Sequence, residues 1–413
     1  MGDDVGIRLL AATLMLLNAA ATASACPFCS AQGTTLSGEV AEADFIVVGR
    51  MLNPRRDPSD ISKGTTDLQI ESVVKPHDFL TGKTLLTIPR YVPGDSAGKD
   101  GKFIIFCKLH TPAAFTATAA VASAAVFADP RTVTLDAYRG EPVDGKSKLA
   151  DYLAGAIAVR DKDSTTRLRY FFDFLDAPDL VISTDAMNEF GSADYKQVRA
   201  LSLTLTPGKV LGWIKDPNTP QSRLGLYGLF IGHCGKKDDA AALRALLDGT
   251  ETRFIGGLDG ILAAYTLLDP PAGWAYLNQL IADEKSDFQI RYAVFKVLGF
   301  FWDYRQDVIK QDDILGGMLK LMAIGDMADL PMEYLRKWGR FEMTDKVLAY
   351  ADVKSHGGVP IVRRAILKFA LAAPADHAAA KAYVEKIRAE DPDRVKFVQE
   401  TLNDELKPLP AKP

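Results

Sequence analysis

The sequence has few of the residues that usually carry chemistry. It contains only four cysteines and five histidines in 413 residues, and the histidines are scattered along the chain. No HExxH pair is present to hold a catalytic zinc, and no regular calcium-binding loop appears. We therefore expect no catalytic residue, no metal site and no cofactor, and we interpret the chain as a non-enzymatic protein.

The chain also lacks an excess of charge of one sign. Its 49 basic and 53 acidic residues give a net charge of −4 and are interspersed. Without a basic field, nucleic acid is not an expected partner. After the first thirty residues no apolar run reaches the roughly eighteen residues of a membrane-spanning helix, so we expect no transmembrane segment in the mature chain. Peripheral association with a membrane stays open.

One long apolar run is present, from Leu9 to Ala23, and it leads into the small residues Ala23-Ser24-Ala25. A run of about fifteen residues is too short to span a bilayer, and small residues at this spacing suit signal peptidase. We predict that residues 1–25 are a signal peptide and that the protein is exported, to the periplasm or the extracellular space. A lipid anchor on Cys26 and a retained apolar tail are the alternatives.

The mature chain is too long for one ordinary hydrophobic core, since about 390 residues would remain after cleavage. A change of sequence pattern near residue 146 divides it further. We predict a β-barrel domain over 26–145, a linker and first helix over 146–164, a helical repeat domain over 165–395 and a tail over 396–413.

Short β-rich runs separated by proline and glycine occupy the first half. A lone hairpin could not bury the apolar faces of five such strands, so they predict a small barrel or sandwich. Residues 33–43, before the first strand, are expected to form a short helix. The expected strands are residues 44–49, 66–74, 84–91, 102–109 and 131–135.

Cysteines mark the start of this domain and one of its strands. The pair Cys26 and Cys29, the strand Phe45 to Arg50 and the distant strand cysteine Cys107 resemble the netrin-like module, which also underlies the tissue inhibitors of metalloproteinases. The resemblance covers about residues 26–138 and implies an OB-type barrel. It also implies that the free amine and carbonyl of Cys26 could chelate the zinc of an exported metalloprotease.

The four cysteines allow three complete pairings. One interpretation is a structural disulfide from Cys26 or Cys29 to Cys107, which would pin the amino terminus to a strand. Another is that Cys26 and Cys29 close on each other as a thiol–disulfide redox pair. Cys234 follows His233, but it has no evident orienting acid, so we interpret it as a core cysteine.

Beyond residue 146 the apolar residues follow the helical period. Successive stripes recur every 32 to 40 residues, and a second helical stripe lies between each pair. This pattern resembles a degenerate HEAT-type array over about Leu168–Ile387, because each helix pair could bury its apolar face only against its neighbours. A non-repetitive helical bundle is the alternative. The stripes begin at Leu224, Leu258, Ile290, Leu330 and Val362.

The expected fold is therefore α+β and multidomain, with a small OB-like β-barrel followed by an all-α HEAT-like solenoid. Solenoids of this kind commonly bind proteins on their concave surface, so we expect a protein partner. The alternative functions are the redox protein and the metalloprotease inhibitor described above.

Two further patterns bear on binding. Acidic residues gather near aromatic ones after residue 170, and carboxylates with rings could line a calcium- or glycan-binding groove. A literal phosphate-loop match, Gly140–Ser147, contains Pro142 and two carboxylates where a phosphate would bind, so we interpret it as a linker. Asp185 and Glu189, at positions i and i+4, are expected to share one helical face. The acidic binding candidates are Asp173, Asp176, Asp185 and Glu189.

Overall fold

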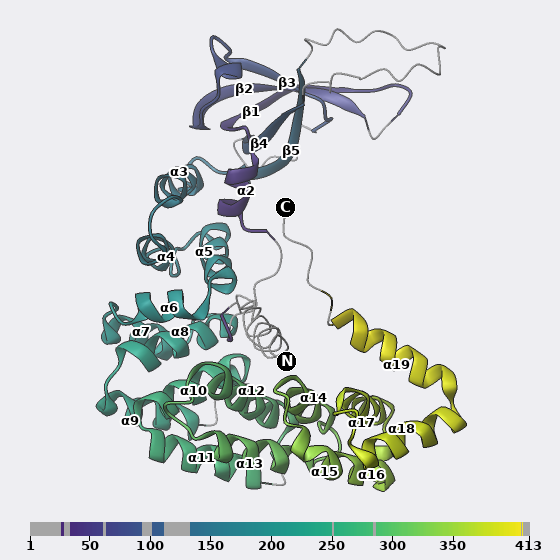
Figure 1. The fold of residues 1–413 in the computed structure, drawn as a ribbon. Helices are drawn as coiled ribbons and strands as arrows, with labels where there is room; N and C mark the ends of the chain where they lie inside the picture. Colours follow the sequence, from purple (N-terminus) through teal and green to yellow (C-terminus); the bar gives the residue numbers. More distant parts are fainter. Residues whose placement is uncertain are drawn as a thin grey trace, which may run out of the picture. The chain divides into compact units, whose positions relative to one another are not determined.

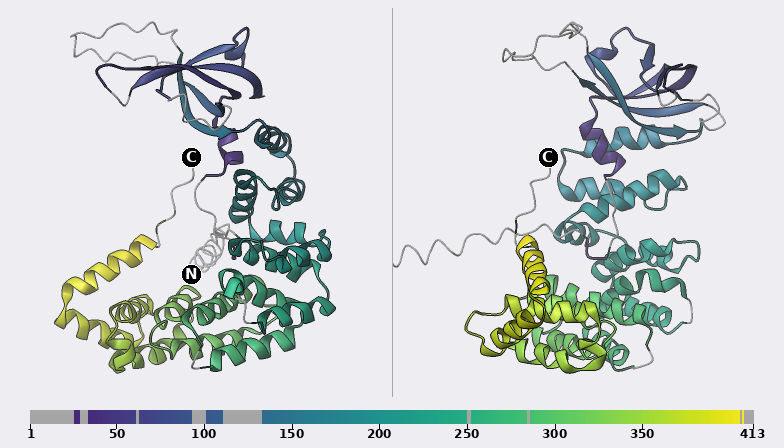
Figure 2. Two further views of the ribbon diagram at one scale, coloured as in Figure 1. Left: turned by 180° about the vertical axis from the view of Figure 1, so that it is seen from behind. Right: turned by 90° about the vertical axis from the view of Figure 1, so that its right-hand side faces the viewer.

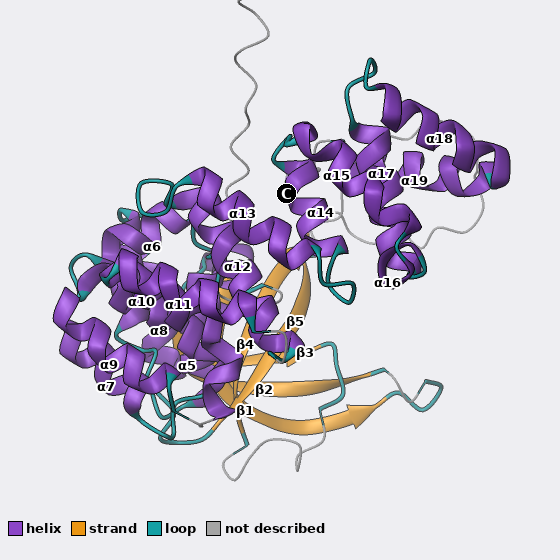
Figure 3. Ribbon diagram, turned by 90° about the horizontal axis from the view of Figure 1, so that it is seen from below, coloured by secondary structure: helices purple, strands orange, loops and turns teal. Residues whose placement is uncertain are grey.

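The computed structural model describes residues 26–28, 34–60, 63–92, 101–110, 133–249, 252–283, 286–405 and 407. The chain divides into two compact units, Met1–Leu201 and Ser202–Pro413. The first unit contains an antiparallel sheet and several helices, whereas the second is largely helical (Figure 1; Figure 3). The predicted signal peptide, residues 1–25, and Cys29 lie outside the described residues.

Five antiparallel strands form one sheet in the order β3-β2-β1-β4-β5. Each predicted β-rich run contributes a strand, although β1 and β5 extend well beyond their predicted ends. The predicted closed barrel is wrong, because β3 and β5 are the two edges and no strand pairing joins them. The strands are β1 (Phe45–Arg56), β2 (Gly64–Lys75), β3 (Leu85–Ile88), β4 (Lys102–His110) and β5 (Thr134–Val143).

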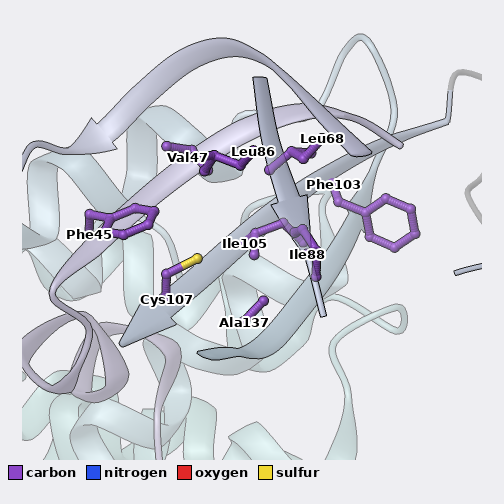
Figure 4. Close-up of a cluster of buried hydrophobic side chains, with 9 residues drawn as sticks. All are labelled: Phe45, Val47, Leu68, Leu86, Ile88, Phe103, Ile105, Cys107 and Ala137. Atoms are coloured by element: carbon purple, nitrogen blue, oxygen red, sulfur yellow. The ribbon is translucent and has the colours of Figure 1, made fainter. Parts of the chain in front are cut away.

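The lengths and burial of the strands explain why the sheet stays open. The first five residues of β1 are buried and the rest is mostly exposed, so the core lies near one end of the strand. The edge strand β3 has only four residues, too few for the continuous staggered pairing that closes a barrel. The apolar core is drawn in Figure 4 and consists of Phe45, Val47, Leu68, Leu86, Ile88, Phe103, Ile105, Cys107 and Ala137.

Cys107 belongs to this core. It pairs with Phe45 across β1 and β4, it has no exposed surface, and its thiol is free. The predicted disulfide from Cys26 or Cys29 to Cys107 is therefore wrong, because the sulfur lies among the core side chains of the sheet (Figure 4). Cys234 is also a free thiol, whereas Cys26 is disulfide-bonded, so neither Cys107 nor Cys234 is the partner of Cys26.

Helices of the first unit pack beside the sheet and on one another. Helix α2 contacts β4, α3 and α5, and Lys75 of β2 donates to the carbonyl oxygen of Val40 at 2.8 Å near the end of α2. Asp163 and Asp179 cap α4 and α5 through their carboxylates. These helices are α2 (Leu36–Glu42), α3 (Leu149–Val159), α4 (Ser164–Phe172) and α5 (Leu180–Ser192).

The second unit consists of helices joined by short connections, and α6 (Tyr195–Ser202) crosses the division between the units. In the described part of the chain, no helix has both the length and the hydrophobicity to cross a membrane. The longer helices of the second unit are α7 (Pro207–Lys215), α8 (Gln221–Cys234), α9 (Lys237–Leu247), α10 (Leu258–Leu268), α11 (Pro270–Ala282), α12 (Phe288–Tyr304), α13 (Gln311–Met322), α14 (Asp329–Lys337), α17 (Pro360–Ala372), α18 (Ala378–Glu390) and α19 (Pro392–Glu405).

Shorter elements complete both units. One single turn follows β2 in the first unit, and the others connect the longer helices of the second. They are the helices α15 (Thr344–Ala349) and α16 (Lys354–Gly357) and the 3₁₀ turns η1 (Asp78–Leu80), η2 (Thr252–Gly257), η3 (Phe341–Met343) and η4 (Tyr350–Asp352).

The helices of the second unit pack mainly on near neighbours in the sequence. Helix α10 contacts α8 and α12, and α14 contacts α17, whereas α9, α11 and α13 pack beside them (Figure 1; Figure 2). Each predicted helical stripe from Leu224 onward begins inside or at the start of one of these helices. The prediction of a largely helical region after the sheet is therefore confirmed.

Candidate functional site

The four acidic residues predicted to bind a ligand lie in two places of the first unit. Asp173 and Asp176 are exposed at and just beyond the end of α4, and Asp173 pairs with Arg169 at 3.8 Å. Asp185 and Glu189 are one turn apart on α5, with Asp185 buried and Glu189 partly buried. The shared helical face predicted for Asp185 and Glu189 is present.

Asp185 is used by the chain itself. Its carboxylate accepts hydrogen bonds from the backbone N–H of Leu36 at 2.5 Å and from the hydroxyls of Ser37 and Tyr152, each at 2.7 Å. Thr35 donates to Glu189 at 2.5 Å. Because these donors come from the start of α2 and from α3, the pair of carboxylates holds both segments to α5.

Burial affects the pKa of two groups in this network. It raises the pKa of Glu189, which the hydrogen bond from Thr35 opposes and the neighbouring charge of Asp185 reinforces. Burial also raises the pKa of Tyr152, so its hydroxyl keeps the proton that it donates to Asp185. Among the described residues, no three His, Cys, Asp or Glu side chains come together as a metal site.

The two free thiols, Cys107 in β4 and Cys234 at the end of α8, are poor nucleophiles. Burial, reinforced by Asp136, raises the pKa of Cys107 to about 12, and burial raises that of Cys234 to about 11. Both sulfurs therefore stay protonated at neutral pH, whereas a reactive cysteine needs a lowered pKa. Cys234 is only partly buried, so it is not the core cysteine that the sequence predicted.

The phosphate-loop match has a local structural role. Gly140 to Val143 belong to β5, so they run as an extended strand. The Ser147 hydroxyl donates to Asp179 at 3.1 Å and accepts from the N–H of Leu149 at 3.2 Å. Pro142, Val143 and Ser147 line a cleft of about 570 Å³ with the start of α5. The motif therefore joins the last strand to the first helix after it.

A serine motif was overlooked in the sequence. Gly94–Gly98 matches the GxSxG pattern of serine hydrolases but lies outside the described residues. That pattern places its serine on a turn leading from a strand into a helix. Here the next described element is the strand β4.

A chain of aromatic rings extends along α12 and α14. Neighbouring ring centres lie 4.3 to 6.0 Å apart, which is the range of favourable stacked and edge-to-face contacts. We call this set the aromatic strip. In order of contact, it consists of Phe288, Tyr292, Phe295, Tyr334, Trp338 and Trp302.

Helical spacing creates the strip. Phe288, Tyr292 and Phe295 are four and three residues apart on α12, so they share one face. Gly299 continues that face, and a Cβ atom there would come within 2.8 Å of the Tyr334 ring. Because Gly299 has no side chain, the Tyr334 ring of α14 can pack directly against α12.

Exposure differs along the strip. Phe295 and Trp302 are buried, whereas Phe288 is 45% exposed and Tyr292 is 41% exposed. The buried rings pack the two helices together, and the exposed ones present apolar surface to solvent. Such exposure costs hydrophobic free energy in isolation, about 25 cal/mol per Å².

Polar groups border the far end of the strip. The indole N–H of Trp338 donates to Asp303 at 3.2 Å, and the Arg340 guanidinium lies 5.6 Å from the centre of the Trp302 ring. Burial raises the pKa of Asp303, opposed by the Trp338 hydrogen bond. Burial, reinforced by Asp303, also raises the pKa of Tyr334. Aromatic side chains that also carry a hydrogen-bonding group, such as Tyr and Trp, are enriched at protein interfaces.

The exposed end of this strip was not predicted from the sequence. Tyr334 and Trp338 follow Leu330 in a predicted helical stripe, and no prediction singled out Phe288 or Tyr292. The available signal was a run of aromatic residues at positions i, i+4 and i+7, which is equally typical of a buried helix face.

A scan against protein-family models and searches of curated proteins and solved structures found no match to this chain.

Proposed function

We propose that this chain is an exported, non-enzymatic binding protein whose helical unit is a HEAT-like solenoid that engages a protein partner through the aromatic strip. The single observation that carries the proposal is the exposed end of the strip, Phe288 and Tyr292, which continues into buried rings. Rings that already pack against buried rings lose little conformational entropy when a partner covers them.

The packing of the helices supports the solenoid. Helices α8 and α9, α10 and α11, and α12 and α13 follow one another as pairs, and each of α10 and α12 packs on the preceding even-numbered helix. Stacked pairs of this kind bury their apolar faces against neighbours and leave a long lateral surface for binding. A non-repetitive bundle would place helices distant in sequence against one another more often.

The exposed rings fit a protein better than a small molecule. Tyrosine and tryptophan are enriched at protein interfaces, where they carry a large share of the binding energy. The alternative functions have no exposed group of this kind, because Cys26 is buried and disulfide-bonded among the described residues. The redox and inhibitor hypotheses both depend on Cys26, and the redox pair also needs Cys29, which lies outside them.

Affinity capture with a matched pair of variants tests the proposal. The mature chain, residues 26–413, is immobilised and incubated with an exported-protein fraction, beside the variants Phe288→Ser/Tyr292→Ser and Leu203→Ser. Leu203 is a suitable control because it is also exposed, at 61%, in the helical unit. Far-ultraviolet circular dichroism establishes that all three proteins fold alike.

We expect one reproducible protein partner, retained by Leu203→Ser and reduced at least about ten-fold by the double substitution, since a central aromatic contact contributes about 2 kcal/mol or more. A partner held equally by the double variant would remove the aromatic strip from the proposal. Recovery of no reproducible partner would count against a binding function altogether.

A further inference from the structure

A recess in the second unit combines positive charge with exposed apolar surface. It has a volume of about 340 Å³ and lies where the start of α17 meets α19. None of the patterns in the sequence pointed to it. Its lining includes Pro360, Ile361, Arg363, Arg364, Arg394 and Phe397.

The charge of the recess is poorly compensated. The guanidinium groups of Arg363 and Arg364 are exposed and make no ion pair or hydrogen bond with any described side chain. Arg394 approaches a carboxylate only at 4.0 Å, that of Asp391. Helix α17 has no acidic residue in its first turn and no side-chain cap on its N-cap residue Val359. The recess is therefore positively charged on balance, although Arg394 lies near Asp391 and the charge of Arg364 acts on the carboxyl of Asp329.

Apolar side chains stand next to these arginines. Ile361 is 49% exposed and Phe397 is 58% exposed, whereas Val398 is buried beneath them. Arg394 and Phe397 lie one turn apart on α19, so the ring and the guanidinium share a face. A ligand that fills the recess must therefore be anionic and apolar at adjoining positions.

We propose that this recess binds an acidic peptide segment of a partner protein, in which a carboxylate lies beside one large apolar side chain. The carboxylate pairs with the planar, fork-shaped guanidinium groups, which bind it through two parallel hydrogen bonds. The apolar side chain covers Ile361 and Phe397. A volume of about 340 Å³ accommodates a side chain and its neighbour but not a whole helix.

The surrounding charge favours a peptide over a membrane. Glu390 and Asp393 are exposed next to the turn between α18 and α19, close in sequence to Arg394. A flat anionic bilayer that reached the arginines would also approach these carboxylates, which repel it. A short acidic peptide can place a carboxylate in the recess without bringing a wide anionic surface against Glu390 and Asp393. The inference goes beyond the aromatic strip, because it uses other helices and stands without it.

Fluorescence anisotropy with defined peptides tests the proposal on the mature full chain. The probes are labelled hexapeptides of sequence GDDFDG, GDDSDG and GKKFKG, which separate the need for charge from the need for the ring. The variants are Arg363→Gln/Arg364→Gln and Phe397→Ser. The control Arg388→Gln removes an exposed arginine of α18 that is already paired with Glu385.

We expect GDDFDG to bind, GKKFKG not to bind, and GDDSDG to bind at least about five-fold more weakly, in line with the loss of one buried aromatic contact. The double arginine variant should weaken GDDFDG binding at least about ten-fold, and Arg388→Gln should leave it unchanged. Binding of GDDFDG should also weaken as salt is raised. The strip variant Phe288→Ser/Tyr292→Ser should bind the peptide normally.

Two results would overturn the inference. One is no GDDFDG binding at about 1 mM peptide, or binding that ignores the arginine substitutions. The other is arginine-dependent sedimentation with phosphatidylserine–phosphatidylcholine vesicles in the absence of peptide binding, which would assign the recess to a membrane surface. Neither result bears on the aromatic strip, so failure here is distinguishable from failure of the proposed function.

Discussion

At the scale of single residues, Asp185 is a carboxylate that connects helices by accepting hydrogen bonds from α2 and α3. The sequence placed it on one helix face with Glu189, and both side chains indeed bind donors. The donors belong to α2 and α3, which no spacing along α5 could reveal. Contacts between residues about 150 positions apart are set by tertiary packing, so the sequence predicted the face but not its partners.

Substitution of Asp185 by alanine should loosen the start of α2. The change leaves the buried N–H of Leu36 and the hydroxyl of Tyr152 without their acceptor, and each such buried donor costs about 1–3 kcal/mol. Hydrogen exchange measured by mass spectrometry should show faster exchange in residues 36–42. Circular dichroism should show a lower midpoint of urea unfolding.

Asp173→Ala is the matched control for this change. Asp173 is exposed and its nearest cation is Arg169 at 3.8 Å, so the free energy of unfolding should change by less than about 0.5 kcal/mol. Equal exchange of residues 36–42 in the two variants would show that Asp185 does not hold α2 in place.

Cys107 shows what residue spacing could not predict, namely which face of its strand carries the thiol. Its position on a strand was predicted correctly, and alternation in that strand is compatible with either face. Only the packed sheet decides that the thiol points into the core, where it is fully buried and free. A disulfide framework therefore cannot be deduced from cysteine positions alone.

At the scale of elements, strand β5 was the least well predicted. Its expected end was Leu135, but the strand continues through Gly140 and Pro142 to Val143. Glycine and proline normally end strands in sequence-based predictions. As β5 is an edge strand, it can tolerate a proline that has no N–H to donate. The strands β1, β2 and β4 have clearer apolar runs and were located within a few residues at their starts.

A close contact between α8 and α10 gives a prediction at the same scale. A Cβ atom on Gly228 would come within 2.4 Å of the backbone carbon of Gly260, so neither helix can approach as closely with a side chain there. Gly228→Ala should therefore lower the free energy of unfolding by about 1–3 kcal/mol, as overpacking does. Thermal unfolding followed by circular dichroism measures the change.

Gly212→Ala provides the control with the opposite sign. Gly212 lies exposed in α7, and a Cβ atom there meets nothing within 4 Å. Alanine in place of a helical glycine should raise stability by about 0.5–1 kcal/mol, because the unfolded chain loses conformational freedom. If both substitutions had the same effect, the close packing of α8 against α10 would be contradicted.

For the whole molecule, the sequence predicted a sheet followed by a helical region. It did so because the change from short β-rich runs to the helical period is visible over many residues. Closure of the sheet was not predictable in the same way. Closure depends on whether the edge strands β3 and β5 pair, and β3 proved only four residues long.

Binding surfaces were the least predictable feature at this scale. Aromatic residues at helical spacing are usually core, and here Phe295 is buried whereas Tyr292 is exposed on the same helix. The recess near Arg363 depends on the meeting of α17 with α19, which are joined in sequence through another helix. Both features follow from packing of helices rather than from any local motif.

Site-specific photo-crosslinking tests the central claim, partner binding through the aromatic strip, most directly. A benzophenone amino acid replaces Tyr292 in one sample and Leu180, exposed at 72% in the first unit, in another. After irradiation in an exported-protein fraction, the account predicts a discrete protein adduct from position 292 and none from position 180. An adduct from position 180 alone, or the same adducts from both, would contradict it.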